Sequence, residues 1–260
     1  MRNNYFIFKA HSIIGAILNL VLKLMILIRH RTLKYSVILK KIENDSISMV
    51  DLAKILGLEP TIIEIGSHVG IDTEKFANIF PKGQIYSFEA NPELYMIAKE
   101  RIKKYKNITL VCAAIDKTCG IGEFYQSSGT SNGSGSLLKP TLHLTRHPSV
   151  LFEDKNKFNV ATLNLDQCLK NLHGTLIDLF WIDVQGAELR VLEGGLKLLA
   201  KTRFVYTEVS KIPEYKGGVS YMELQIFMQQ AGFKVETEFL PQKWLGSGNV
   251  LFKNTQLKTN

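Results

Sequence analysis

The stretch that decides the fold is TIIEIGSHVGID, residues 61–72. Its first three residues favour a β-strand and lead into Glu64. Glycines follow at Gly66 and Gly70, and a helical pattern begins near Asp72. A buried strand that ends at glycines and opens into a helix presents free backbone N–H groups and a positive helix end. The stretch therefore predicts a strand, a turn and a helix that cradle the polar part of a nucleotide-like ligand.

The glycine spacing narrows the class of ligand. The pattern reads E-x-G-x-x-x-G, and His68 stands where a middle glycine could sit in the G-x-G-x-x-G fingerprint of dinucleotide-binding sheets. Taken alone, the pattern also suits an ordinary strand-to-helix turn without a ligand. An NAD-dependent oxidoreductase on the same kind of sheet is an alternative that this spacing disfavours.

The rest of the chain alternates between strand-like and helical segments. After the second strand, Asn91 as N-cap and Pro92 at the first helical position mark the start of a helix. Such alternation predicts an α/β fold with a doubly wound, mostly parallel sheet and an antiparallel hairpin at one edge. The seven expected strands are 61–65, 84–88, 108–113, 176–184, 204–209, 234–239 and 249–252, and the expected helices are 33–57 (with a turn at 45–46), 73–80, 92–105, 187–199 and 220–231.

Residues 116–160 interrupt this alternation. They hold a strand-like run near 120–128, a loop rich in Gly, Ser, Thr and Asn at 127–136, and a stretch with no clear period, before another strand-like run at 158–167. A long insertion of this kind is usually functional or mobile.

The positive charge is confined to the beginning of the chain. Residues 1–41 hold eight basic residues and no acidic ones, whereas the remaining residues hold 24 basic and 24 acidic residues. The whole net charge of +8 therefore comes from residues 1–41. The main domain therefore lacks the basic footprint of a nucleic-acid-binding protein, and we expect no nucleic-acid partner.

Residues 12–28, SIIGAILNLVLKLMILI, are very apolar, with Lys23 in their interior. As a helix they would span about 25 Å, short of the roughly 30 Å hydrocarbon core of a bilayer. Three interpretations stay open: a helix lying in a membrane interface, a single short span, or a helix packed on its own domain or on a second copy. A cleaved signal peptide is not expected, since the following RHRTLK is strongly basic and no small-residue cleavage site precedes it. We expect a cytoplasmic main domain, which the first two of these interpretations would associate with the cytoplasmic membrane face through this helix.

Length, composition and cysteine content agree with one intracellular domain and an appendage. The chain has 260 residues, 45% of them apolar and 22% charged, which is enough to bury a full core. Its three cysteines, Cys112, Cys119 and Cys168, form no C-x-x-C pair, so we expect free thiols in a reducing compartment and no metal or disulfide framework. The expected division is a helical extension at 1–57 and a main domain at 58–256.

Acids stand at the ends of four expected strands. They are Glu64, Glu89, Asp183 and Glu208. Ligands of open α/β sheets bind outside the carboxyl ends of the strands. Glu89 follows Glu64 by 25 residues, which places a carboxylate where it can accept hydrogen bonds from both ribose hydroxyls of a nucleoside. The four acids together favour a nucleoside site over solvated strand ends.

Several motifs, in this order and spacing, resemble the FkbM family of S-adenosylmethionine-dependent methyltransferases. They are IIEIGSHVG (62–70), SFEANP (87–92), the loop SNGSGSL (131–137), TLNLDQ (162–167), IDLFWIDVQGAELRVLEGG (177–195) and VYTEVS (205–210). The resemblance covers about residues 61–252. Its most specific part is IDVQGAELRVLEGG, where the family usually reads I-D-V-E-G-A-E.

The resemblance implies a class I methyltransferase fold, which is Rossmann-like, and S-adenosyl-L-methionine as cofactor. Glu89 would then bind the ribose hydroxyls, Ala114 and Asp116 would lie near the adenine, and Asp183 would lie nearest the reacting centre. The residues implied to bind the cofactor are Glu64, Gly66, Ser67, His68, Gly70, Glu89, Ala90, Asn91, Ala114, Asp116 and Asp183.

The chain departs from the family pattern at two positions. His68 stands where Asn is usual, and Gln185 stands where Glu is usual, which puts any role of that carboxylate in doubt. A sugar or alkyl hydroxyl is a poor nucleophile, so a general base helps methyl transfer. Asp183 is the first candidate for that base, and Glu208 or His68 the second.

The family's range of acceptors suggests an O-methyltransferase for a hydroxyl of a sugar, glycan, glycolipid or related metabolite. A protein or small-metabolite acceptor, or a non-catalytic scaffold tethered to a membrane, are the alternatives. We expect no metal, although Asp183 and Glu208 could hold a divalent ion. His143 and His147 are interpreted as substrate-loop or surface residues rather than as ligands.

Overall fold

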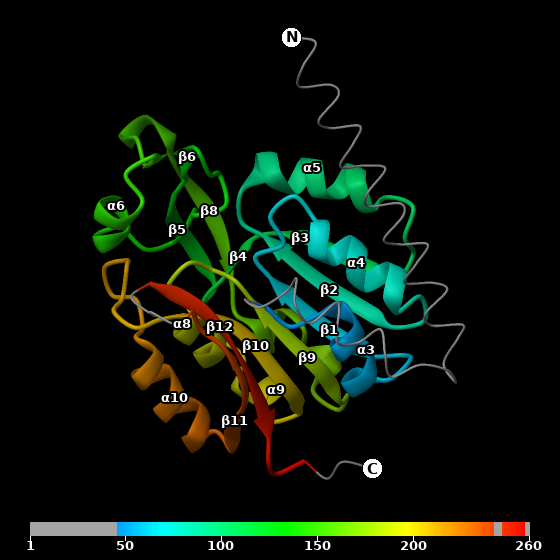
Figure 1. The fold of residues 1–260 in the computed structure, drawn as a ribbon. Coiled ribbons are helices and arrows are strands. Elements are labelled where there is room, and N and C mark those ends of the chain that lie inside the picture. Colours follow the sequence, from blue (N-terminus) through cyan, green and yellow to red (C-terminus); the bar gives the residue numbers. More distant parts are fainter. Residues whose placement is uncertain (1–45, 242–245, 258–260) are drawn as a thin grey trace, which may run out of the picture.

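The computed structural model describes residues 46–241 and 246–257 of the chain. Seven strands form one main sheet at the centre of the molecule (Figure 1). They are β1 (Thr61–Ile65), β2 (Gln84–Glu89), β3 (Ile108–Cys112), β9 (Ile177–Ile182), β10 (Thr202–Ser210), β11 (Phe233–Phe239) and β12 (Ser247–Asn254).

The strand order across the main sheet is β11-β12-β10-β9-β1-β2-β3. β1 pairs in parallel with β2 on one side and with β9 on the other, and β10 continues the parallel run. The chain therefore moves outward from β1 to β3 and then returns to the opposite side of β1. This reversal between β1 and β9 confirms the predicted doubly wound sheet and marks the place where such sheets bind ligands.

The predicted hairpin at the edge is also confirmed, with one further detail. β12 runs antiparallel to both β10 and β11 and lies between them. After β10 the chain forms β11 at the edge of the sheet, one position away from β10. β12 then returns and occupies the position between them.

Helices cover both faces of the main sheet (Figure 1). One face packs α3 (Met49–Leu56), α4 (Ile71–Ile79) and α5 (Pro92–Ile102), and the other packs α8 (Glu188–Glu193), α9 (Leu196–Leu199) and α10 (Tyr221–Gln230). Because alternate residues of a strand face opposite sides, Ile62 joins the core under α3 and α4 while Ile63 joins the core under α8 to α10. Both side chains are fully buried, and each such burial contributes about 1.5–3 kcal/mol.

The local signals for helix ends are confirmed in several places. Asn91 caps α5 by accepting from the N–H groups of Glu93 and Leu94, and Pro92 is its first residue. Ser220 and Glu223 form a capping box at the start of α10. Strong caps near the expected boundaries explain why these helices could be placed from sequence.

The single helix expected at 187–199 is wrong. The chain forms α8 and α9, separated at Gly194 and Gly195. A Cβ on Gly194 would lie 2.4 Å from the backbone oxygen of Asp116, so the backbone of the insertion passes directly against this break. Tertiary contact with a distant segment therefore overrides the local helical pattern.

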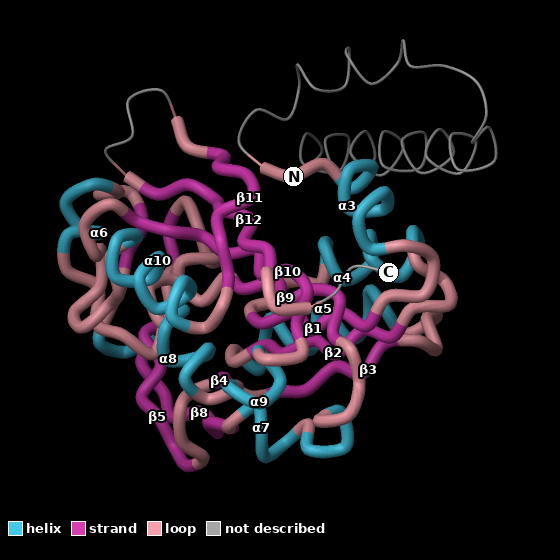
Figure 2. Tube along the Cα trace, turned by 90° about the horizontal axis from the view of Figure 1, so that it is seen from below, coloured by secondary structure: helices cyan, strands magenta, loops and turns pink. Residues whose placement is uncertain are grey.

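The insertion forms two small sheets and a short helix to one side of the main sheet (Figures 1 and 2). The first sheet has the order β4-β8-β5 and the second pairs β6 with β7. Its elements, with the short helices that lead back to the main sheet, are β4 (Ala114–Ile115), β5 (Gly120–Tyr125), β6 (Ser128–Gly129), α6 (Leu142–Arg146), β7 (Val150–Leu151), η1 (Asp154–Asn156), β8 (Lys157–Leu163), α7 (Leu165–Cys168) and η2 (Lys170–Leu172).

Residues 46–57 pack on the main sheet. The N–H of Ile47 donates to the Tyr206 hydroxyl at 3.3 Å, and Arg203 donates to the backbone oxygen of Ile55 at 3.0 Å. In the described ranges no helix has the length and apolarity needed to cross a bilayer. The apolar segment at 12–28 and the expected helix before residue 46 lie outside the described residues, so membrane association through them stays a prediction.

Glu64 ties the first strand to the helix that follows it. It is buried within β1, and its Oε2 accepts hydrogen bonds from Thr73 Oγ1 on α4 and from Ser87 Oγ on β2, both at 2.6 Å. Burial raises the pKa of Glu64 to about 7, and the two hydroxyl donors only partly offset the rise. The strand, the turn and α4 are therefore held together around one carboxyl group.

The first prediction concerns Gly66→Ala. At Gly66 the φ angle is 92°, and an added Cβ would lie 1.8 Å from the backbone oxygen of Asp183. Left-handed strain alone costs about 1–2 kcal/mol, and the overlap adds to it. We expect the free energy of unfolding, measured by urea denaturation, to fall by at least about 2 kcal/mol.

The matched control is Gly174→Ala, where an added Cβ meets nothing within 4 Å. This variant should stay within about 0.5 kcal/mol of the wild type. A Gly66→Ala protein as stable as the Gly174→Ala protein would contradict the close approach of β1 and β9.

The second prediction concerns pH. The folded pKa of Glu64 is about 7 against a usual value of 4.5, so the folded chain keeps a proton that the unfolded chain releases. The stability that this provides is complete below about pH 4.5 and is lost as the pH rises through 7, by up to about 3 kcal/mol. In Glu64→Gln we expect a smaller fall in the free energy of unfolding between about pH 5 and about pH 7.5 than in the wild type.

Glu59→Gln is the control for this measurement, because the Glu59 side chain is 62% exposed. Equal pH slopes in the wild type and Glu64→Gln would show that burial does not perturb this carboxyl group.

Candidate functional site

A cavity of about 400 Å³ opens at the carboxyl ends of β1, β2 and β9. This is the place where strand order reverses, and ligands of such sheets bind there. Eight of the residues implied by the sequence line this first cavity: Glu64, Gly66, Ser67, His68, Glu89, Ala90, Ala114 and Asp183.

The turn after β1 differs from the cradle of free N–H groups that the sequence predicts. The N–H groups of Gly66 and Ser67 both donate to the backbone oxygen of Phe88 at 3.0 Å. The N–H of His68 donates to Glu89 Oε2 at 2.7 Å, and that of Gly70 donates to Ser67 at 2.8 Å. These four donors are therefore used inside the protein, and the prediction of free N–H groups is wrong for them. The first three hold the turn against β2, and the Gly70 N–H closes the turn on itself.

Glu89 is held at the end of β2 by the backbone on both sides. His68 N–H donates to Oε2 and Asn91 N–H to Oε1, at 2.7 and 2.8 Å. Burial raises the pKa of Glu89 to about 7 despite these donors. A carboxylate has about four acceptor positions, so Glu89 can still accept two further hydrogen bonds in the cavity. Fixed in this way, it suits a pair of neighbouring hydroxyl groups.

The cavity also has an apolar side and an unused polar atom. Phe88, Ala114, Ile115 and Phe124 line it between β2 and the insertion. Ser67 Oγ is buried and has no hydrogen-bond partner among the described residues. A nucleoside with a polar substituent fits these features, because its flat ring can cover the apolar side while its polar groups reach Ser67 and Glu89.

The Ser/Gly-rich loop at 131–137 closes one side of the cavity. Asn132 Oδ1 lies 2.8 Å from His68 Nε2, and Gly133 lines the cavity beside them. Ser136 Oγ donates to the backbone oxygen of Gln185 at 2.9 Å. These contacts were not foreseen residue by residue, since only the composition of the loop is visible in the sequence.

Asp183 and Glu208 are joined through Gln185. The amide Nε2 of Gln185 donates to Asp183 Oδ1 at 2.7 Å and to Glu208 Oε2 at 2.9 Å. Gln185 adopts a φ of 54°, in the left-handed region that non-glycine residues rarely use. Such strain is concentrated at functional sites, and here it places one amide between two acids.

The two acids differ in their surroundings. Asp183 is open to the first cavity, although the enclosing protein raises its pKa by desolvation. Burial raises the pKa of Glu208 to about 8, and repulsion from Asp183 adds to the rise. Desolvation thus raises the pKa of both acids, and what separates them is position, because the exposed Asp183 side chain lines the first cavity and Glu208 lines the second.

Two further cavities adjoin the first. The second, of about 350 Å³, holds Glu208 and Gln185 and shares Gly133 with the first cavity. The third, of about 250 Å³, shares Asp183 and Trp181 with the first. Asp183 thus stands where the first cavity meets the third. Trp181 has one face stacked on Tyr206, with ring centroids 4.2 Å apart.

Three implied cofactor residues lie outside the lining of the first cavity. Gly70 caps α4 in the left-handed conformation, and an added Cβ there would press on Ala98 at 3.1 Å. Asn91 caps α5 with its side chain. The Asp116 carboxylate accepts two hydrogen bonds from Arg190, one of them at 2.7 Å. These observations give all three a structural role, and cofactor contact by them stays a prediction.

The comparisons with known proteins agree with this geometry. Residues 64–235 match the model of the methyltransferase FkbM domain. The chain is 32% identical over 204 residues to the 2-O-methyltransferase NoeI of Sinorhizobium fredii, an alignment that covers 76% of this chain and 81% of the relative.

Solved methyltransferases resemble the chain at low identity. A SAM-dependent methyltransferase from Aquifex aeolicus has a TM-score of 0.42 at 16% identity and covers 82% of this chain and 92% of its own. Fibrillarin from Aeropyrum pernix, in complex with S-adenosyl-L-methionine, has a TM-score of 0.42 at 10% identity and covers 76% and 68%. The matched family model spans more than half of the sequence, which decides against the oxidoreductase alternative. The chain belongs to the FkbM family of S-adenosyl-L-methionine-dependent methyltransferases.

Proposed function

We propose that this enzyme methylates a hydroxyl group of a sugar, glycan, glycolipid or related metabolite. The observation that carries the proposal is the Asp183 carboxylate, which is open at the junction of the first cavity with the third. A relative that shares 32% of its residues is a 2-O-methyltransferase, which supports oxygen as the atom that receives the methyl group.

The first cavity offers the groups that S-adenosyl-L-methionine requires. Glu89 would accept hydrogen bonds from the ribose hydroxyls, the apolar side beside Phe88 and Phe124 would cover the adenine, and the unpartnered Ser67 Oγ would bind a polar group of the methionine part. The bound cofactor supplies an electrophilic methyl group on a sulfonium. The protein therefore has to hold the acceptor oxygen in line with that methyl group and remove its proton.

Asp183 is the best-placed general base. Its Oδ1 accepts a hydrogen bond from Gln185, which orients the carboxylate and leaves Oδ2 for the acceptor hydroxyl. When the methyl group passes from the sulfonium sulfur to the acceptor oxygen, which leaves S-adenosylhomocysteine, Asp183 Oδ2 would take the hydroxyl proton. Glu208 is less suited because it lines the second cavity and not the first, where the cofactor would bind. His68 is engaged with Asn132 at 2.8 Å, which makes it the weaker candidate as well.

The third prediction tests the cofactor site. S-adenosylhomocysteine at millimolar concentration should raise the thermal unfolding temperature of the wild type, since a ligand that binds only the folded state stabilises it. In Glu89→Ala we expect that rise to disappear, because two hydrogen bonds to a charged group, each worth about 1.5–3 kcal/mol, are lost. Differential scanning fluorimetry measures both effects.

Glu93→Ala is the matched control, because Glu93 is an exposed acid at the start of α5, four residues from Glu89. It should keep the full rise in unfolding temperature. No rise in the wild type, or an equal rise in Glu89→Ala, would sink the assignment.

The fourth prediction tests the base. Asp183→Asn keeps the size of the side chain but cannot accept the hydroxyl proton, so we expect kcat to fall by about 10²- to 10⁴-fold. Stabilisation by S-adenosylhomocysteine should remain. The assay is transfer of a radiolabelled methyl group to a panel of oligosaccharides and glycolipids.

Asp154→Asn, at an exposed acid of the insertion, serves as the control and should keep wild-type kcat. If Asp183→Asn retains full activity on an acceptor that the wild type methylates, Asp183 is not the base.

A further inference from the structure

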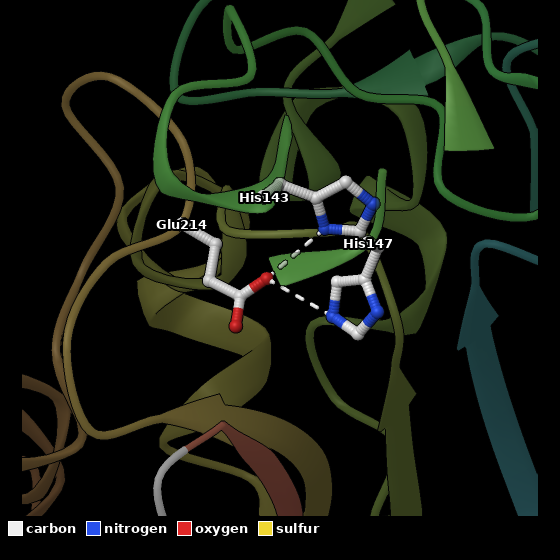
Figure 3. A group of neighbouring side chains, drawn as sticks. All are labelled: His143, His147 and Glu214. Carbon is white, nitrogen blue, oxygen red and sulfur yellow. Dashed lines mark hydrogen bonds and ion pairs between the residues drawn. The ribbon is translucent and has the colours of Figure 1, made fainter. Parts of the chain in front are cut away.

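Three further side chains that line the second cavity, His143, His147 and Glu214, lie together. Figure 3 shows them. His143 belongs to α6, His147 directly follows that helix, and Glu214 lies in the loop after β10. Figure 3 shows both imidazole rings turned toward the same carboxylate oxygen. Glu214 Oε2 lies 3.0 Å from His143 Nδ1 and 3.6 Å from His147 Nε2.

The local backbone explains how these side chains meet. The four-residue spacing brings both rings to one side of α6, with centroids 4.6 Å apart. The N–H groups of Thr141 and His143 donate to the backbone oxygen of Glu214, at 2.9 and 3.2 Å. The insertion and the loop after β10 are thus fastened together by main-chain bonds beside the three side chains, which fixes their separation.

The three side chains have the composition of a transition-metal site. One nitrogen from each histidine and one oxygen from Glu214 all lie within 4.8 Å of one another. Zinc binds two histidines and one glutamate with ligand distances of about 2.0–2.2 Å, and a fourth position is left for water or substrate. Atoms 3.0 and 3.6 Å apart are at the spacing of ligands that share one such ion.

The groups around the three side chains suit a bound cation. Arg146 Nη1 donates to the other carboxylate oxygen, Oε1, at 2.7 Å, and leaves Oε2 facing the histidines. Outer partners of this kind orient a metal-binding carboxylate.

We propose that His143 Nδ1, His147 Nε2 and Glu214 Oε2 bind one divalent transition-metal ion, with Zn²⁺ the best match to two nitrogens and one oxygen. Its open position faces the second cavity, where Gln185 and Glu208 also lie. An oxygen atom of a molecule in that cavity can occupy this position. The ion also links the insertion to the loop after β10. The metal site is independent of the proposed methyl transfer.

The test is a titration of the full chain, free of any polyhistidine tag and stripped of metal, with ZnCl₂ by calorimetry and with CoCl₂ by visible absorption. We expect one equivalent to bind, with cobalt bands typical of a four-coordinate site. His147→Ala should weaken binding by at least about tenfold, because even the loss of an outer partner of a ligand costs that much. The His147 side chain is 50% exposed, so this variant keeps the fold where His143→Ala could lose it.

His173→Ala is the control, since this partly exposed histidine directly follows η2 and is not one of the three proposed ligands. Its affinity for Zn²⁺ should equal that of the wild type, and Zn²⁺ should raise the unfolding temperature of both but not of His147→Ala. A wild type that binds no tighter than His147→Ala would overturn the proposal, as would an equal loss in His173→Ala. None of these readouts uses methyl transfer, so the two proposals fail separately.

Discussion

The site depends on the close approach of two backbone segments at the switch point of the sheet. The N–H of Asp183 donates to the backbone oxygen of Ile65 at 2.9 Å, and the Asp183 oxygen lies where a side chain at Gly66 would stand. With no Cβ at that position, β1 and β9 stay paired to their last residues. The turn from β1 and the acid from β9 therefore reach the same cavity.

Much of this arrangement could be predicted, because it depends on local sequence patterns. The strand–glycine–helix stretch, the Asn91 cap and Glu89 at the end of β2 depend on residues near one another in the chain. The parts that could not be predicted join distant segments. The carboxylate of Asp116 pairs with Arg190, and the turn's N–H groups bind Phe88 and Glu89. No local pattern reports such pairings, since they arise only when the sheet has formed.

The buried acids show how one site can hold several carboxyl groups. Burial raises the pKa of Glu64, Glu89 and Glu208 to about 7 or above, so these groups exchange protons near physiological pH. Gln185 is an uncharged donor between Asp183 and Glu208. A third carboxylate in its place would raise the repulsion among these groups. The sequence departs from the family pattern at Gln185, where Glu is usual. In the structure this departure places an uncharged amide between Asp183 and Glu208.

The insertion between β3 and β9 has a consequence for how this enzyme can diversify. It supplies the loop beside His68 and both histidines beside Glu214, yet it leaves the main sheet at β3 and rejoins it at β9. Glu89 and Ser67, which line the first cavity, belong to the sheet and its first turn, while the insertion supplies the apolar Ala114 and Phe124 of that cavity and part of the wall of the second. A change confined to this segment therefore alters the second cavity and the apolar wall of the first cavity together, while Glu89 and Ser67 stay as they are.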